Sequence, residues 1–370
     1  MPPLNTTVEL VDSRRAIRLI QDQTTVVYHA QWLRDHCQGS CCRNAANGQR
    51  LIDVADLAED VRVAHAIIEK AQLKLQFSDD HESEYPLAWL QSLSNAPESA
   101  NLRGHRSKTL WDSSLTLLGI NYSEYLGNSK LRALRQVRDL GFVVLHDVPC
   151  VPGTVLEVIN NFGFVRNTNY GELFDVRVEV NPNNLAFSNA SIGCHTDNPY
   201  RDPVPTIQLL HCLQNSTAGG DSILLDGFQA ALLLRQENPS HFECLSQQSV
   251  VYRYSNANTD ICSRVAMIEL DDHSEIVKVR YNNRSIAPLH PQREGLAAFY
   301  DAYRHFAKIL RREELMVQFK MAPGDLVLFD NTRVMHARSG FDAGGNRHLQ
   351  GAYADLDGLY STLAVLEASA

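Results

Sequence analysis

The most informative stretch of this sequence is Cys194-His195-Thr196-Asp197-Asn198-Pro199-Tyr200, which directly follows Gly193. It carries a histidine and an aspartate at positions i and i+2 of a strand-like run. Side chains of an extended segment repeat with period 2, so His195 and Asp197 point to the same side. An imidazole and a carboxylate placed in this way can take two adjacent positions on one metal ion. The stretch therefore predicts part of a metal site on a β-strand.

The third ligand must come from elsewhere in the chain, and His336 is the best candidate. It lies in the run Phe329–Arg338, and we expect the strand Leu326–Asp330, fed by the turn Pro323-Gly324-Asp325, to deliver it. Two histidines and one carboxylate on one face of a metal form the facial triad of non-haem Fe(II) oxygenases. The opposite positions stay open for a co-substrate and O2. A lone His-x-Asp pair is usually a surface feature, so this interpretation depends on the residues that accompany it.

Two further residues fit the same chemistry. Arg347, in Asn346–Gly351, can hold the far carboxylate of a dicarboxylate co-substrate bidentately. Ser222, at the end of Gly219-Gly220-Asp221-Ser222, can share that carboxylate through its hydroxyl. Each residue alone is most often structural, but together with the metal ligands they form an ordered series of motifs.

This series of motifs resembles that of the Fe(II)- and 2-oxoglutarate-dependent dioxygenases, in the group containing γ-butyrobetaine hydroxylase, trimethyllysine hydroxylase and taurine dioxygenase. Trp32-Leu33-Arg34-Asp35-His36-Cys37 resembles the N-terminal signature of γ-butyrobetaine hydroxylase. The runs Thr206–Cys212, Gly219–Ser222 and Gly351–Asp355 resemble those of its catalytic domain. The resemblance covers nearly the whole chain.

The resemblance implies a fold, a set of ligands and an assembly. The fold is mostly β with flanking helices, and consists of a double-stranded β-helix (jelly-roll) catalytic core and a small N-terminal β-rich zinc-binding domain. Fe(II) is expected on His195, Asp197 and His336. The co-substrate 2-oxoglutarate is expected on Arg347 with Ser222 assisting, and ascorbate is expected to stimulate turnover. A homodimer is also expected from the resemblance.

The length of 370 residues suggests about two domains at roughly 150 residues each. We assign residues 1–95 to the N-terminal zinc-binding domain, 96–112 to a polar linker and 113–370 to the dioxygenase domain. Helices are expected at Leu131–Asp139 and Val151–Phe162, and one helix, Arg293–Arg312, interrupts the strands after Thr206. The expected strands are Thr7–Val11, Thr25–Tyr28, Leu73–Phe77, Gly141–Leu145, Ile207–Cys212, Ile223–Leu225, Val250–Tyr254, Val265–Leu270, Ile276–Tyr281, Val317–Lys320, Leu326–Phe329 and Leu349–Ala354.

The composition narrows the cellular setting. A formal net charge of −9 argues against a general affinity for nucleic acid or for anionic membranes. No apolar run approaches the length of a membrane span, and the N-terminus has no apolar signal core. We therefore expect a cytoplasmic enzyme with reduced cysteines, acting with O2 on a small molecule.

Three of the 8 cysteines fall in Cys37-Gln38-Gly39-Ser40-Cys41-Cys42. The family pattern is Cys-x-Cys-x-x-Cys with a later histidine, but its middle cysteine falls on Gly39, which cannot bind a metal. Cys41 can replace it through a local backbone adjustment, and His81 is the later histidine. Cys37, Cys41, Cys42 and His81 are thus expected to hold a structural zinc ion tetrahedrally. The alternative is a degenerate site of buried, reduced thiols.

The substrates of the related hydroxylases carry a trimethylammonium group. Such a cation has no N–H to hydrogen-bond, so proteins hold it against aromatic faces. By resemblance the cage positions are Tyr170, Phe174, Phe187 and Tyr353, and all four are aromatic here. The alternative for each is core packing. An intact cage argues against taurine-type substrates, which have no methylated cation.

The other end of the substrate is acidic. Asn184 and Asn283 match family positions that contact it, and Asn198 and Tyr200 can supply further donors. Arg284 adds a guanidinium that suits a doubly charged tetrahedral anion such as a phosphonate. The resemblance therefore points to hydroxylation of 2-(trimethylammonio)ethylphosphonate to its 1-hydroxy product in phosphonate catabolism. Alternatively, Arg284 is a solvated or ion-paired surface residue.

Three other functions stay open from the sequence. The same chemistry on γ-butyrobetaine makes carnitine, and Arg284 is the residue that separates this reading from the phosphonate reading. A non-enzymatic, cupin-like binding protein would use the jelly roll as a sensor. A zinc hydrolase with the same triad would act without O2 or 2-oxoglutarate.

Overall fold

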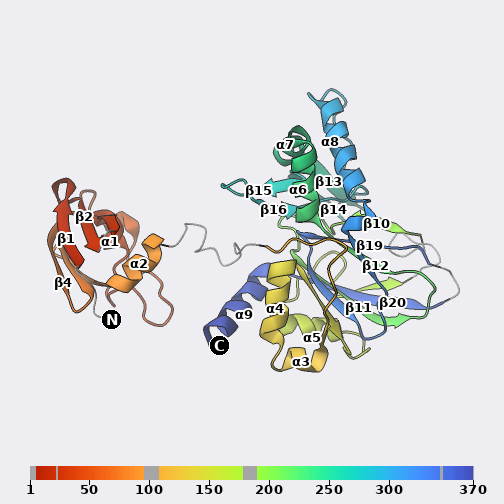
Figure 1. Cartoon of the computed structure of the whole chain (residues 1–370), viewed down its shortest axis with the longest axis horizontal. Coiled ribbons are helices and arrows are strands. Elements are labelled where there is room, and N and C mark those ends of the chain that lie inside the picture. The colour runs from red at the N-terminus through yellow and green to blue at the C-terminus, as the bar shows by residue number, and fades with distance from the viewer. Residues whose placement is uncertain (1–5, 22–23, 96–107, 178–189, 342–344, 370) are drawn as a thin grey trace. The chain divides into compact units, whose positions relative to one another are not determined.

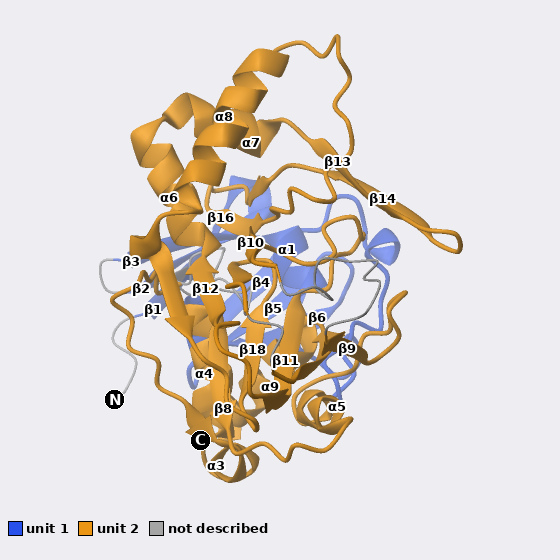
Figure 2. Cartoon of the chain, turned by 90° about the vertical axis from the view of Figure 1, so that its right-hand side faces the viewer, with its two compact units in different colours: residues 1–102 blue, residues 103–370 orange. Residues whose placement is uncertain are grey.

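The computed structural model describes residues 6–21, 24–95, 108–177, 190–341 and 345–369. The chain divides into two compact units, Met1–Leu102 and Arg103–Ala370, which are described one at a time (Figure 1, Figure 2). Two predicted substrate residues, Asn184 and Phe187, lie outside the described residues.

The described part of the first unit contains two three-stranded antiparallel sheets and two α-helices. Along the middle strand of the second sheet, Leu73, Leu75 and Phe77 are buried and the residues between them are more exposed. This period-2 pattern is the one that predicted a strand there. The elements are β1 (Thr6–Val11), β2 (Ala16–Gln21), β3 (Thr24–His29), α1 (Ala30–Asp35), β4 (Val63–Glu69), β5 (Gln72–Phe77), β6 (Glu82–Pro86) and α2 (Leu87–Asn95).

The described residues of the second unit form a four-stranded sheet, in the order β10-β19-β12-β17, and a six-stranded sheet, in the order β7-β8-β18-β11-β20-β9. Side chains from both sheets, among them Leu224 and Phe329, share one apolar cluster, so the sheets pack face to face. This is the expected double-stranded β-helix. The strands are β7 (Ile120–Asn121), β8 (Phe142–His146), β9 (Phe174–Arg177), β10 (Ile192–His195), β11 (Ile207–Asn215), β12 (Ser222–Asp226), β17 (Met316–Phe319), β18 (Leu326–Asp330), β19 (Val334–Arg338) and β20 (Arg347–Ala354).

Helices cover the outer face of the six-stranded sheet. In β18, Val327 and Phe329 belong to the cluster between the sheets, whereas Leu326 and Leu328 pack in the cluster that contains the helices. Both faces of the strand are therefore buried, which explains its continuous apolar sequence. Gly141 ends the helix Lys130–Leu140 with a φ of 87°. The helices are α3 (Tyr122–Leu126), α4 (Lys130–Leu140), α5 (Thr154–Asn160) and α9 (Leu356–Ser369).

A separate apolar cluster organises the segment between β12 and β17, which projects beyond the two sheets (Figure 1). In this segment helices pack on one another and on two hairpins. We call it the insert. Its elements are α6 (Gly227–Glu237), α7 (Pro239–Gln247), β13 (Val250–Ser255), β14 (Asp260–Val265), β15 (Ile268–Leu270), β16 (Ile276–Val279) and α8 (Leu296–Ile309).

Two expectations for the chain after Thr206 are corrected. The prediction of one helix after Thr206 is wrong, because α6, α7 and α9 are also present. The buried face of α6 follows a helical period, but Leu232 and Leu233 interrupt that period in the sequence. The expected strand Val265–Leu270 is instead the end of β14 and the start of β15.

A third correction concerns the strand that carries His336. The strand Leu326–Asp330 exists as β18, but it does not deliver this histidine. The chain turns between β18 and β19, and His336 lies on β19 in the four-stranded sheet. The buried guanidinium of Arg333 fixes the turn through an ion pair of 2.8 Å with Asp226.

Candidate active site

The three predicted metal ligands lie together in the second unit. His195 ends β10, and its direct cross-strand partner on β19 is His336. Asp197 follows two residues later and places its carboxylate 3.4 Å from His195 Nε2 and 3.9 Å from His336 Nε2. One ligand atom from each residue lies within 4.8 Å of the other two. The sheet register therefore gathers the His-x-Asp pair and a distant histidine into one cluster.

Neighbouring groups fix the orientation of these ligands. The Gly193 carbonyl accepts a hydrogen bond of 2.9 Å from His195 Nδ1, which leaves Nε2 to face Asp197. Asp197 Oδ2 accepts hydrogen bonds from Gln208 Nε2 at 2.8 Å and from the Tyr353 hydroxyl at 3.0 Å. This second set of contacts is typical of residues that hold a metal ion.

The protonation states also suit a metal ion. Burial, together with the proximity of His195, lowers the pKa of His336 to about 3, so its imidazole is neutral near pH 7. Burial alone would raise the pKa of Asp197, but its hydrogen bond with His195 and its proximity to His336 hold that pKa well below the usual range. A neutral imidazole and a carboxylate are ligands that Fe(II) accepts.

A cavity of about 490 Å³ opens onto this cluster. It is lined by the three predicted iron ligands and by most of the predicted co-substrate and substrate residues. Its volume lies in the range of small-molecule sites, about 300–1,000 Å³. The predicted residues on its wall are His195, Asp197, His336, Arg347, Ser222, Tyr170, Phe174, Asn198, Tyr200, Arg284 and Tyr353.

The predicted co-substrate residues occupy the end of the cavity formed by β12, β19 and β20. Arg347 is only 8% exposed, and its Nε has no hydrogen-bond partner among the described residues. A buried guanidinium without an acidic partner is costly unless a ligand supplies the anion. This orphaned donor fits the distal carboxylate of 2-oxoglutarate. Ser222 lines the same cavity.

Aromatic side chains form a continuous part of the wall. The ring of Phe174 stacks on that of Tyr353, with centroids 5.1 Å apart, and lies 6.2 Å from the ring of Tyr170. Tyr254 of the insert extends this wall, with its centroid 5.9 Å from Tyr170 and 5.3 Å from Tyr200. Three of the four predicted cage residues are thus adjacent.

The predicted anion contacts are only partly brought together. Asn198 and Arg284 line the cavity, but Asn283 is not among the described residues that do so. The side chain of Asn283 instead accepts a hydrogen bond of 2.7 Å from Tyr303. Its neighbour Asn282 lines the cavity in its place. The expectation for Asn283 is therefore corrected by one position.

Several wall residues were missed by sequence reasoning. Gln208 is the one polar residue within Ile207–Leu210, and this could have singled it out. Arg338 lies two residues after His336, so the period-2 argument used for His195 and Asp197 applies to it equally. The sequence offers no comparable signal for Tyr254.

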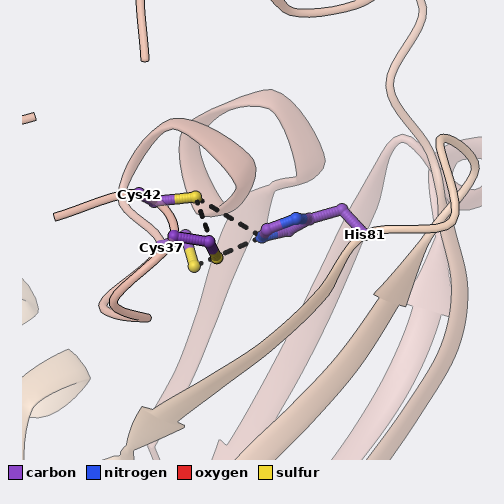
Figure 3. A group of neighbouring side chains, drawn as sticks. Cys37, Cys42 and His81 are labelled. Atoms are coloured by element: carbon purple, nitrogen blue, oxygen red, sulfur yellow. Dashed lines mark hydrogen bonds between the residues drawn. The ribbon is translucent and has the colours of Figure 1, made fainter. Parts of the chain in front are cut away.

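The predicted zinc ligands also form a cluster, in the first unit. Figure 3 shows the sulfurs of Cys37 and Cys42 turned toward His81, whose Nε2 lies 3.3 Å from Cys37 Sγ and 3.6 Å from Cys42 Sγ. Cys41 Sγ is 3.7 Å from Cys42 Sγ. A Cβ atom added to Gly39 would lie 3.4 Å from the sulfurs of both Cys37 and Cys41. Cys41 therefore brings its thiol close to the space that a side chain at position 39 would occupy.

Comparison with known families agrees with this geometry. The profile of the Taurine catabolism dioxygenase TauD, TfdA family matches residues 104–353, and that of the Gamma-butyrobetaine hydroxylase-like N-terminal domain matches residues 13–91. The chain belongs to the TauD, TfdA dioxygenase family. It is thus a dioxygenase that uses Fe(II) and 2-oxoglutarate, with a Cys/His cluster compatible with zinc.

The relatives of this dioxygenase match it over most of their length. Gamma-butyrobetaine dioxygenase from Pseudomonas sp. (strain AK-1) is 34% identical, over 92% of this chain and 90% of its own. The Homo sapiens protein of the same name is 30% identical, over 97% of this chain and 96% of its own. A solved taurine dioxygenase from Burkholderia xenovorans has a TM-score of 0.50 at 14% identity, over 67% of this chain and 89% of its own, and so shares the fold. Among the described residues, no helix combines the length and apolar character needed to cross a bilayer.

The shifted cysteine gives a testable prediction for the metal cluster of this dioxygenase. Cys41→Ser should reduce bound zinc from about one ion per chain to well below half, because a structural site needs four ligands. Adding Gly39→Cys to that variant should restore zinc, since position 39 lies beside the same sulfurs. Metal analysis of the purified proteins measures both effects. Equal zinc in Cys41→Ser and the wild type would show that Cys41 is not a ligand.

The hydroxyl of Tyr353 gives a second prediction. Tyr353→Phe keeps the ring but removes the hydrogen bond to Asp197, so the affinity for Fe(II) should fall about tenfold. Titration of the metal-free protein with Mn(II) under anaerobic conditions measures this change. Tyr360→Phe is a matched control, because that hydroxyl contacts Lys108 and Tyr360 does not line the cavity. An unchanged metal affinity in Tyr353→Phe would show that the hydrogen bond from Tyr353 to Asp197 does not support metal binding.

Proposed function

We propose that this dioxygenase hydroxylates a small zwitterion that carries a quaternary ammonium group at one end and an acidic group at the other. The observation that carries the proposal is that the described aromatic wall, the anion-binding side chains and the His-Asp-His cluster all line one cavity. Each end of such a substrate thus has a matching set of side chains.

The cation end is supported by the rings of Tyr170, Phe174 and Tyr353. Their faces can attract a trimethylammonium group, which has no N–H to donate. The hydroxyl of Tyr353 also donates a hydrogen bond to Asp197, so this aromatic residue directly contacts a predicted metal ligand. A cation held here would bring its neighbouring carbon atoms close to the metal.

The anion end is supported by the amide of Asn198, which has an N–H donor unpaired among the described residues, and by the guanidinium of Arg284. Asn198 is 3% exposed, and its Oδ1 accepts a hydrogen bond of 2.7 Å from Tyr200. This contact orients the amide, whose Nδ2 has no partner among the described residues. Arg284 lines the same cavity, and its charge acts on both Asp197 and His336. A substrate anion would satisfy both groups.

Two substrates fit this description. The relatives named gamma-butyrobetaine dioxygenase support γ-butyrobetaine, whose acidic end is a carboxylate. Arg284 supports a second candidate, 2-(trimethylammonio)ethylphosphonate, because a guanidinium pairs strongly with a doubly charged tetrahedral anion. The relatives favour γ-butyrobetaine. The position of Arg284 on the cavity wall is the observation that supports the phosphonate.

The residues divide the work of the reaction. Bound Fe(II), held by His195, Asp197 and His336, supplies the oxygen chemistry that side chains lack. Arg347 and Ser222 position 2-oxoglutarate, while the aromatic and anion-binding walls aim one substrate carbon at the metal. Misplacement by about 1 Å should cost about a hundredfold in rate.

The test measures succinate formation from 2-oxoglutarate across a panel of zwitterions in the presence of Fe(II), with and without ascorbate. The panel contains γ-butyrobetaine, 2-(trimethylammonio)ethylphosphonate, trimethyllysine and taurine. The proposal predicts turnover with at least one of the first two and none with taurine, and the larger kcat/KM identifies the acidic end. An absence of substrate-dependent succinate with every quaternary ammonium compound would overturn it.

We also propose the domain assignment and a cytoplasmic location, as expected from the sequence, and a homodimer, which the resemblance supports. Light scattering of the purified chain tests the dimer. Stimulation by ascorbate is tested by its omission from the same assay.

A further inference from the structure

We propose that Arg338 is a second arginine for the distal carboxylate of 2-oxoglutarate, acting with Arg347 from the opposite sheet. Arg338 lies on β19 in the four-stranded sheet, and Arg347 begins β20 in the six-stranded sheet. Both line the cavity and both are less than one tenth exposed. The inference rests on 2-oxoglutarate binding at this end of the cavity, which is part of the proposed function.

The sheet register places Arg338 one layer away from the metal ligands. On β19, His336 is the cross-strand partner of Leu224, and Arg338 is the partner of Ser222. Directly opposed residues of antiparallel strands project from the same face of a sheet. Arg338 and Ser222 therefore lie on the face that carries His336, about 7 Å further along the strand.

This spacing suits the co-substrate. In 2-oxoglutarate the distal carboxylate lies three C–C bonds beyond the keto carbon, roughly 4 Å at about 1.5 Å per bond. With its keto end at the metal, the far end would reach the layer that contains Arg338 and Ser222. A long, flexible guanidinium side chain spans the remaining gap.

Both arginines lie against the same aromatic ring, that of Phe341. The guanidinium carbon of Arg338 lies 4.8 Å from the centroid of the Phe341 ring, and that of Arg347 lies 5.8 Å from the same centroid. Two guanidinium groups placed near one ring can both attract one carboxylate. A dicarboxylate bound there would offset both charges.

Arg338 also has a structural contact, since its Nη2 donates to the Ala190 carbonyl at 2.6 Å. A purely structural role must therefore be separated from ligand binding. Arg235 provides a matched control, because it stacks on the Phe242 ring at 4.2 Å and donates to the Ser274 carbonyl at 2.9 Å. Arg235 does not line the cavity.

The experiment measures equilibrium binding by calorimetry to the Mn(II)-loaded full chain, without turnover. Two ligands are compared: 2-oxoglutarate and 2-oxopentanoate, which has the same carbon chain but no distal carboxylate. Arg338→Met should weaken 2-oxoglutarate binding about 10- to 100-fold, the usual range for a charge-assisted hydrogen bond. Its binding of 2-oxopentanoate should change by less than about twofold, and Arg235→Met should change neither.

Each other outcome decides against the inference or against its basis. An equal loss for both ligands would show that Arg338 only supports the fold. No loss for either would show that Arg347 alone holds the carboxylate. If the wild type itself does not prefer 2-oxoglutarate to 2-oxopentanoate, or if Arg347→Met leaves that preference intact, the proposed co-substrate site fails before Arg338 is considered.

Discussion

Replacing Asp197 by alanine should reduce 2-oxoglutarate-dependent hydroxylation by at least about a hundredfold. A catalytic metal supplies several kcal/mol of stabilisation, and each 1.36 kcal/mol is about tenfold in rate. Asp197 is the carboxylate that faces both histidines, and Gln208 and Tyr353 bond to no other carboxylate among the described residues. Its loss removes one of three protein ligands. The measurement is kcat for succinate formation at saturating Fe(II).

Asp221→Ala is the matched control for this variant. Asp221 directly precedes Ser222, and its carboxylate accepts a hydrogen bond from Gln318 at the surface. It should retain activity within about threefold of the wild type, as surface substitutions rarely exceed 0.5 kcal/mol. Comparable activity in Asp197→Ala and the control would contradict the assignment of the iron site.

The second large effect is expected at Arg284. Arg284→Met should raise the KM for the zwitterion at least about 30-fold, because truncating one partner of a close charge pair costs 2–5 kcal/mol. The KM should rise more for the substrate that pairs more strongly with Arg284, so it should rise more for a phosphonate than for a carboxylate. The KM for 2-oxoglutarate should stay within about twofold, since Arg347 lies at the co-substrate end.

Arg304→Met serves as the control for Arg284. Arg304 lies on α8 of the same insert, is 70% exposed and pairs with Asp301. Its replacement should leave both KM values unchanged. If Arg284→Met behaves in the same way, then Arg284 is a surface residue, and the phosphonate candidate has no remaining support.

The jelly roll follows from the family resemblance, whereas the pairing of two iron ligands follows from the period-2 pattern of an extended segment. The strand Leu73–Phe77 and the His195–Asp197 pair follow from this pattern alone, without knowledge of neighbouring strands. His336 was identified from its motif, although the strand carrying it was misplaced. Its burial on β19 depends on the turn after β18, which has no periodic signal.

The remaining wall residues depend on tertiary contacts. Whether Asn282 or Asn283 faces the cavity is decided by an irregular turn, where neighbouring side chains have no fixed alternation. Tyr254 reaches the cavity because β13 bonds to the segment after this turn, through Arg253 N–H to the Ser285 carbonyl at 2.7 Å. Such a pairing between distant segments leaves no mark in either local sequence.

The central claim is that this cavity couples 2-oxoglutarate and O2 to hydroxylation of a quaternary ammonium zwitterion. The most direct measurement is mass spectrometry of the products formed under ¹⁸O₂, with γ-butyrobetaine and 2-(trimethylammonio)ethylphosphonate tested separately. The account predicts one labelled oxygen in succinate and one in the hydroxylated zwitterion. Hydroxylated product formed without O2, or a new hydroxyl group whose oxygen comes from water, would contradict this coupling.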